Sequence, residues 1–121
     1  MASTSRPRVR RGEVWIVALD PVVGSEQAKT RPCVVIQRDA ANERAHTTIV
    51  VPFTGAARRR TSVAEPVVPQ GTGGLTRTSA ALCHQIRVVD RLRFRTRIGS
   101  LDGVHMEAIG RGIAEIVDLA P

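Results

Sequence analysis

Residues 13–37 read EVWIVALDPVVGSEQAKTRPCVVIQ, which is two apolar runs separated by a polar loop. The runs Glu13–Leu19 and Pro32–Gln37 are rich in β-branched residues and are bounded by proline and charge, which predicts two strands. The loop between them, Val22–Thr30, is polar and shows no periodicity. This strand–loop–strand segment indicates a β protein and places Arg31 at the edge of a rigid element.

Further apolar runs follow this segment. Thr47–Phe53 (TTIVVPF) predicts a strand, and because Pro52 lacks an N–H group, that end of the strand should lie at an edge or a bulge. Val63–Val68 predicts a weak strand and Ser79–Val89 a long one. Alternation in the long strand would give one face to Ala81, Cys83, Gln85 and Arg87, and the other face to Leu82, His84, Ile86 and Val88.

The hydrophobic period changes near the C-terminus. Apolar residues recur at helical spacing from Val104 to Val117, and Asp102 stands where an N-cap residue belongs. Gly110 and Gly112 each cost a helix roughly 1 kcal/mol relative to alanine, so we expect this helix to need tertiary packing. Asp90–Arg93 is expected to form a single turn before it. Short strands followed by a helix predict a mainly β fold, a small antiparallel barrel or curled sheet with a C-terminal helix packed on it.

A length of 121 residues favours one domain, which we expect to span residues 11–121. Residues 1–10 (MASTSRPRVR) are polar and basic, and we expect a flexible arm there that either contacts a polyanionic partner or is simply disordered. The net charge is +7, and Lys29 is the only lysine among 18 basic residues. Arginine binds phosphates well, so this balance suits a polyanionic partner, although it also suits solubility.

Cys33 and Cys83 each lie inside an apolar run, which is typical of buried thiols rather than a disulfide or a metal pair. The sequence has no CxxC or HExxH spacing, so we expect no metal site and no cofactor. We see no signal peptide and no apolar run of membrane-spanning length, and therefore expect a cytoplasmic protein without membrane contact.

Arg31 is the most informative single residue. Pro32 biases the residue before it toward an extended conformation, so the polar loop delivers Arg31 to the start of a strand. An arginine held in this way can stabilise negative charge on a phosphate without reorganising. From the residues alone, an ordinary surface arginine at a strand start is the favoured interpretation.

Three segments in this order carry a family resemblance: RRGEVWIVALDPVVGSEQAKTRPCVVIQ, then TTIVVPFT, then LCHQIRVVDRLRFRTRIGSL. Together they resemble the MazF/PemK toxins of type II bacterial toxin–antitoxin systems, over about residues 10–119. The resemblance implies an SH3-like barrel of the CcdB/MazF/PemK toxin type, assembled as a homodimer. It also implies metal-independent, sequence-specific cleavage of single-stranded RNA. The substrate would be mRNA, with tRNA or rRNA as a further option. A cognate antitoxin would inhibit the toxin, and DNA would be bound only indirectly, through the antitoxin complex.

The same resemblance assigns roles to residues. Arg31 and Thr54 would be catalytic: the RNA 2′-hydroxyl attacks the adjacent phosphorus, Arg31 neutralises the phosphorane, and Thr54 bonds an oxygen or orients the hydroxyl. RNA binding would involve Ser25, Glu26, Gln27, Lys29, Arg58, Arg59, Arg60, Gln85 and Arg87. Relatives usually carry an acidic residue where this chain has His84, which could act as a general acid or base or be a structural residue.

Two other functions stay open. A toxin of the same fold could inhibit DNA gyrase, as CcdB does, but the chain ends IVDLAP and its only tryptophan, Trp15, lies in the first strand. A non-catalytic RNA-binding barrel would need no Arg31/Thr54 pair. The scarcity of aromatic residues, 2% of the chain, counts mildly against such a barrel because bases stack on aromatic side chains.

Overall fold

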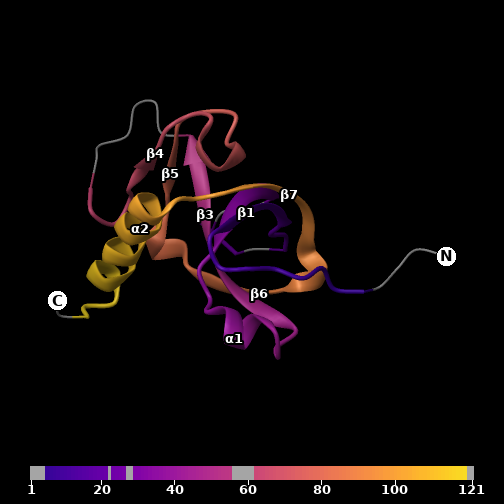
Figure 1. Ribbon diagram of the computed structural model, residues 1–121. Coiled ribbons are helices and arrows are strands. Elements are labelled where there is room, and N and C mark those ends of the chain that lie inside the picture. The colour runs from indigo at the N-terminus through magenta and orange to yellow at the C-terminus, as the bar shows by residue number, and fades with distance from the viewer. Residues whose placement is uncertain (1–4, 22, 27–28, 56–61, 120–121) are drawn as a thin grey trace.

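The computed structural model describes residues 5–21, 23–26, 29–55 and 62–119 (Figure 1). The strands there are β1 (Glu13–Ala18), β2 (Thr30–Val35), β3 (Thr47–Gly55), β4 (Val67–Val68), β5 (Ser79–Ala81), β6 (Arg87–Asp90) and β7 (Phe94–Ser100). The helices are α1 (Asp39–Asn42) and α2 (Gly103–Ile116), with three 3-10 turns, η1 (Thr72–Gly74), η2 (Cys83–Gln85) and η3 (Arg91–Arg93). The predicted fold class, mainly antiparallel β with a C-terminal helix, is confirmed.

The strands form one curved antiparallel sheet in the order β4-β5-β3-β2-β1-β7, and β6 pairs with β3 off this path. Strand β3 is central in this sheet. It pairs with β2 along one side and with two strands, β6 and β5, along the other. Its first part pairs with β6 as far as Val50↔Arg87, and its last part pairs with β5 from Phe53↔Ala81 onward. In Figure 1, β4 and β5 therefore lie at one end of β3 and β6 lies at the other.

Pro52 lies in the gap between these two ladders, so the expected edge or bulge is wrong. The strand is central, and Pro52 is paired with Cys33 of β2 on its other side. Its carbonyl accepts from Leu82 N at 2.9 Å, where the chain has already left β5. The missing N–H of Pro52 therefore costs no ladder hydrogen bond.

The single long strand expected at Ser79–Val89 is also wrong. The chain forms β5, turns through η2, and resumes as β6. The turn is closed by bonds from Gln85 N to Leu82 O and from Ile86 N to Cys83 O. Because β5 and β6 pair with different parts of β3, the segment between them cannot keep the period of two. The expected alternation of His84 and Gln85 is lost with it.

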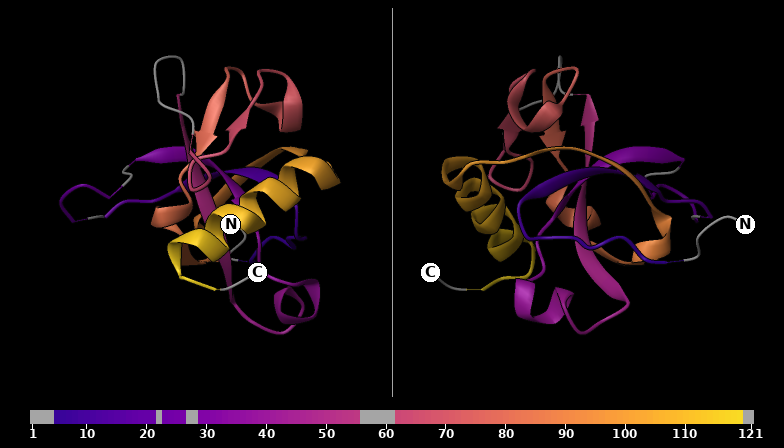
Figure 2. Two further views of the ribbon diagram at one scale, coloured as in Figure 1. Left: turned by 90° about the vertical axis from the view of Figure 1, so that its left-hand side faces the viewer. Right: turned by 45° about the vertical axis from the view of Figure 1, so that its right-hand side comes forward.

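Apolar residues cover both faces of the sheet. One cluster joins Val14, Val34, Val51 and Phe53 to Met106 and Ile109 of α2. This explains the position of α2 along one side of the sheet in Figure 2. The other cluster comprises Val9, Val17, Leu19, Cys33, Val35, Val50, Val89 and Phe94. Cys33 and Cys83 are both buried free thiols, as expected.

Helix α2 begins as the sequence predicts. The Asp102 carboxylate accepts a hydrogen bond from His105 N at 3.0 Å and so caps the first turn. Met106, Ile109 and Gly112 are buried, so the helix has the tertiary packing that its glycines were expected to require. In the described part of the chain, no helix has both the length and the apolar character needed to cross a membrane.

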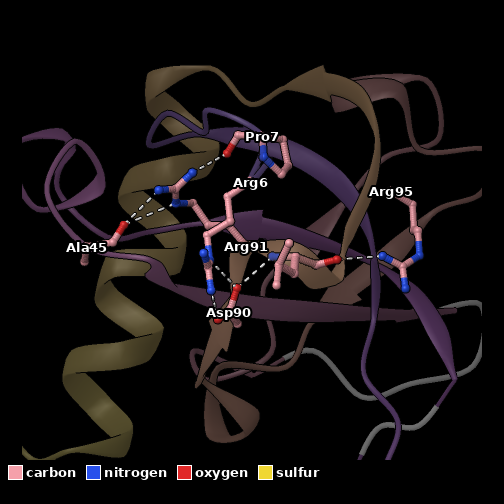
Figure 3. Close-up of polar contacts among 7 residues, drawn as sticks. Arg6, Pro7, Ala45, Asp90, Arg91 and Arg95 are labelled. Atoms are coloured by element: carbon pink, nitrogen blue, oxygen red, sulfur yellow. Dashed lines mark hydrogen bonds and ion pairs between the residues drawn. The ribbon is translucent and has the colours of Figure 1, made fainter. Parts of the chain in front are cut away.

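Residues 5–10 lie against the sheet, which differs from the flexible arm expected over residues 1–10. Val9 is only 6% exposed and belongs to the second cluster. Arg6 forms an ion pair with Asp90, and Arg91 donates to the Pro7 carbonyl at 2.6 Å (Figure 3). Burial of one valine and two arginine contacts thus order a segment whose composition alone indicates flexibility. Residues 1–4 lie outside the described residues.

Candidate active site

The sheet register brings Arg31 and Thr54 to the same face. Cys33 of β2 and Pro52 of β3 are directly opposed, so their side chains share a face. The next residues on that face, two positions further along each strand, are Arg31 and Thr54. Both therefore stand where the paired part of β2 and β3 ends, with Arg31 exposed and Thr54 half-buried.

A groove of about 360 Å³ lies beside this pair. Three separate segments line it, contributing Ser25, Glu26, Pro52, His84, Gln85, Ile86 and Arg87. Arg31 and Thr54 are not in its lining, but Thr54 lies only two residues, roughly 7 Å, beyond Pro52 on the same strand. Five of the residues predicted from the sequence (Ser25, Glu26, His84, Gln85 and Arg87) meet in one groove.

His84 and Gln85 line the same groove because η2 turns both toward it. His84 is exposed, so the alternative in which it is a partly buried structural residue that faces the core with Leu82 and Ile86 is wrong. Gln85 is half-buried, and its Nε2 lies 3.5 Å from the Ser25 carbonyl, so it contacts the loop between β1 and β2. The groove is therefore closed on one side by that loop.

Arg87 connects the groove to the core. Its Nη1 donates to the Leu19 carbonyl at 3.3 Å, and its side chain is half-buried. Burial raises the pKa of the Cys33 thiol to about 12, and the nearby Arg87 charge only partly opposes this effect. Cys33 therefore remains a neutral thiol beneath the groove and is not a candidate nucleophile.

The base of the loop between β1 and β2 is well bonded. Lys29 has a φ of 65°, and its backbone N–H donates to the Asp20 carboxylate at 2.9 Å. Its carbonyl accepts from Leu19 N at 2.7 Å. Glu26 accepts from Val23 N at 2.6 Å, so its carboxylate helps to shape the loop that it belongs to.

Four predicted site residues, Gln27, Arg58, Arg59 and Arg60, lie outside the described residues. Two residues that line the groove, Pro52 and Ile86, were not predicted from the sequence. Neither was Arg93, which donates to the carbonyls of Ala18 and Asp20. Only the alternating arginines of RLRFRTR draw attention to Arg93. Within the described ranges, histidine, cysteine and carboxylate side chains form no group of three or more that could hold a metal ion.

Residues 10–117 match the model of a protein family described as PemK-like, MazF-like toxin of type II toxin–antitoxin system. The chain belongs to this family. Over 105 residues it is 34% identical to endoribonuclease EndoA of Bacillus subtilis, covering 87% of this chain and 90% of that relative. The family resemblance carried by the sequence motifs is thus confirmed.

Solved structures of MazF toxins share the fold of this MazF-family toxin. MazF from Deinococcus radiodurans superposes with a TM-score of 0.80 at 18% identity, covering 93% of this chain and 99% of that one. A mycobacterial endoribonuclease in complex with its cognate antitoxin gives a TM-score of 0.77 at 18% identity, covering 93% and 98%. At such low identity these likenesses establish the fold alone.

Proposed function

We propose that this MazF-family toxin is an endoribonuclease that cuts single-stranded RNA at specific short sequences by attack of the 2′-hydroxyl, without a metal ion. The observation that carries the proposal is the shared face of Arg31 and Thr54 beside the groove. Membership of the toxin family and the naming of a 34% identical relative as an endoribonuclease support it.

Arg31 would stabilise the transition state. Attack by the 2′-hydroxyl oxygen forms a bond to phosphorus and breaks the bond to the 5′-oxygen, and charge builds on the non-bridging oxygens between these events. A guanidinium has several N–H donors in one plane and can donate to two such oxygens at once. Arg31 lies at the start of β2, before Pro32, so its backbone does not need to reorganise as that charge develops.

Thr54 would act from the neighbouring strand. Its hydroxyl can donate to a non-bridging oxygen or accept from the 2′-hydroxyl and so align it for attack. Thr54 is half-buried on β3 and is paired with Ala80 of β5, which fixes the part of the strand that presents it. The nucleophile would be absent from DNA, which predicts selectivity for RNA.

Proton transfer completes the balance of the reaction. The 2′-hydroxyl loses a proton, the 5′-oxygen gains one, and the products are a 2′,3′-cyclic phosphate and a free 5′-hydroxyl. His84 is the candidate acid or base, because it is exposed in the groove and an imidazole exchanges protons near neutral pH. Arg31 is the alternative proton carrier.

The groove would hold the RNA strand on either side of the cut. Ser25, Gln85 and Arg87 offer hydroxyl, amide and guanidinium groups, which together can bond base edges and phosphates. Glu26 lines the same groove, and Lys29 is exposed at its loop. By their place in the sequence, Gln27 and the arginines 58–60 remain further candidates for RNA contact and for sequence preference.

The proposal extends to partners. The solved mycobacterial relative is bound to its cognate antitoxin, which supports a cognate antitoxin for this chain as well. We propose a homodimer that acts in the cytoplasm, where mRNA is present, and that contacts DNA only through the antitoxin complex.

Cleavage of a mixed single-stranded RNA in the presence of EDTA tests the proposal. Wild type should cut the RNA and leave 2′,3′-cyclic phosphate ends, and Arg31→Ala and Thr54→Ala should each lower the rate by about 10²-fold or more. A 2′-deoxy substitution at the cut site should block cleavage there. Arg95→Ala is the matched control, because Arg95 is exposed on β7 and its guanidinium donates to the nearby Leu92 carbonyl.

Two outcomes would contradict the proposal. One is RNA that stays whole under all conditions, in which case DNA supercoiling by gyrase would be assayed next. The other is cleavage by both variants at the wild-type rate.

A further inference from the structure

We propose that Arg93 is a positioning residue that fixes the base of the loop between β1 and β2, and through it Arg31. The inference rests on the proposed ribonuclease function and adds to it a residue that was given no role from the sequence and does not line the groove. Arg93 belongs to η3 and is half-buried.

Two guanidiniums bind consecutive carbonyls where β1 ends. Arg93 Nη1 donates to the Ala18 carbonyl at 3.3 Å and also to the Asp20 carbonyl. Arg87 Nη1 donates to the carbonyl between them, that of Leu19, at 3.3 Å. The end of β1 and the start of the loop are thus held from the side by η3 and β6.

Hydrogen bonds at Leu19 and Asp20 connect the start of the loop to its end at Lys29. The Asp20 carboxylate accepts from the backbone N–H of Lys29, and Leu19 N donates to the Lys29 carbonyl. Both polar backbone groups of Lys29 are therefore bonded, which stabilises a φ of 65° that a non-glycine residue rarely adopts. Arg31 follows two residues later, directly opposite Val17.

Arg93 itself starts from a rigid base. Asp90 caps η3 by accepting from Leu92 N at 2.9 Å, and it also binds Arg6. Arg91 donates to the carbonyls of Ala45 and Pro7, as Figure 3 shows. The turn that carries Arg93 is therefore attached to the N-terminal segment and to the residues before β3, which fixes the backbone from which the Arg93 side chain extends.

A positioning role makes a distinctive prediction. Asp20 is exposed, so water can replace the Arg93 bonds at the loop base when the side chain is removed, and folding should change little. The catalytic geometry should change more, because displacement of a reacting group by about 1 Å can cost about 10²-fold in rate. Lysine carries the charge but presents its donors from one nitrogen, so it can replace the guanidinium only in part.

Steady-state cleavage of a short RNA by the full chain tests this inference. Arg93→Ala should lower kcat about 10-fold or more and change KM by less than about threefold, and Arg93→Lys should recover part of kcat. The control Arg95→Ala removes the same charge two residues away and should stay within about twofold of wild type.

Three outcomes would overturn the inference: an unchanged kcat in Arg93→Ala, a rise in KM alone, which would indicate a direct phosphate contact, or an equal loss in Arg95→Ala. A second measurement separates this inference from the proposed function. Hydrogen exchange of the Lys29 amide should be faster in Arg93→Ala than in wild type and unchanged in Arg95→Ala. If wild type cuts no RNA, the proposed function fails and this exchange rate alone decides whether Arg93 holds the loop base.

Discussion

Arg6 and Asp90 are 84 positions apart in the sequence and form an ion pair through two contacts. Arg6 Nε lies 2.8 Å from Asp90 Oδ1, and Nη2 lies 3.0 Å from Oδ2. Figure 3 shows this ion pair, and Asp90 Oδ1 also accepts a hydrogen bond from Leu92 N at 2.9 Å. The same carboxylate thus fixes the N-terminal segment and caps the turn that carries Arg93.

This carboxylate predicts a pH dependence of stability. The Arg6 hydrogen bonds, followed by the Leu92 N–H, lower the pKa of Asp90 to about 2. An aspartate in the unfolded chain has a pKa of about 3.9, so the pair contributes stability above about pH 4 and loses it as pH falls toward 2. We expect Asp90→Asn to unfold at a lower temperature than wild type at pH 7, and the difference to vanish near pH 2.

Thermal unfolding followed by circular dichroism between pH 2 and 7 measures this difference. Asp118→Asn is the control because Asp118 is exposed and lies beyond the end of α2. A difference between wild type and Asp90→Asn that persists unchanged to pH 2 would show that the ionised carboxylate is not its source.

Alanine substitutions at two glycines of α2 should have opposite effects on the stability of the protein. A Cβ built on Gly112 would lie 2.6 Å from Cys83 Sγ and 2.6 Å from the Val63 carbonyl, whereas a Cβ on Gly110 meets nothing within 4 Å. Gly112→Ala should therefore destabilise the protein by about 1–3 kcal/mol through overpacking. Gly110→Ala should stabilise it by up to about 1 kcal/mol through helix propensity. Urea unfolding measures both, and a Gly112→Ala variant as stable as Gly110→Ala would contradict the packing argument.

These glycines illustrate what the sequence can and cannot predict about the fold. Local signals located α2, because the 3.6-residue period and the cap at Asp102 depend on neighbouring residues alone. The space around Gly112 depends on Cys83 and Val63, which reach it only in the folded chain. Strand β7 was not predicted because it has few apolar residues: four of its seven residues are exposed, and the strand is defined by its pairing with β1.

The candidate site, too, was predictable from the sequence only in part. Composition made Arg31 one arginine among many, and only the resemblance to a family distinguished it and paired it with Thr54. The register of β2 and β3 supplies a physical reason for that pairing. The error at Ser79–Val89 arose because a run of apolar residues indicates a strand but not its partner. The change of partner along β3 forces the turn that brings His84 and Gln85 into one groove.

The buried thiols should be inert in the folded protein. Burial raises the pKa of Cys33 to about 12 and that of Cys83 to about 11, so neither forms a thiolate at pH 8. A disulfide reagent such as dithionitrobenzoate should therefore label neither cysteine in the native state and both in urea. Rapid labelling of one thiol in native protein would show that the cluster around it opens, and Cys33→Ser and Cys83→Ser would identify which.

His84 predicts a change in the pH profile of cleavage. If His84 moves a proton in the groove, His84→Gln should lower kcat by about 10²-fold and remove one limb of the rate–pH profile. RNA affinity should change little, because glutamine keeps a side chain of similar length that can donate and accept hydrogen bonds. His46→Gln is the matched control, since His46 is exposed and lies outside the groove. If His84→Gln keeps both limbs of the rate–pH profile, whatever its kcat, Arg31 remains the group that carries the proton.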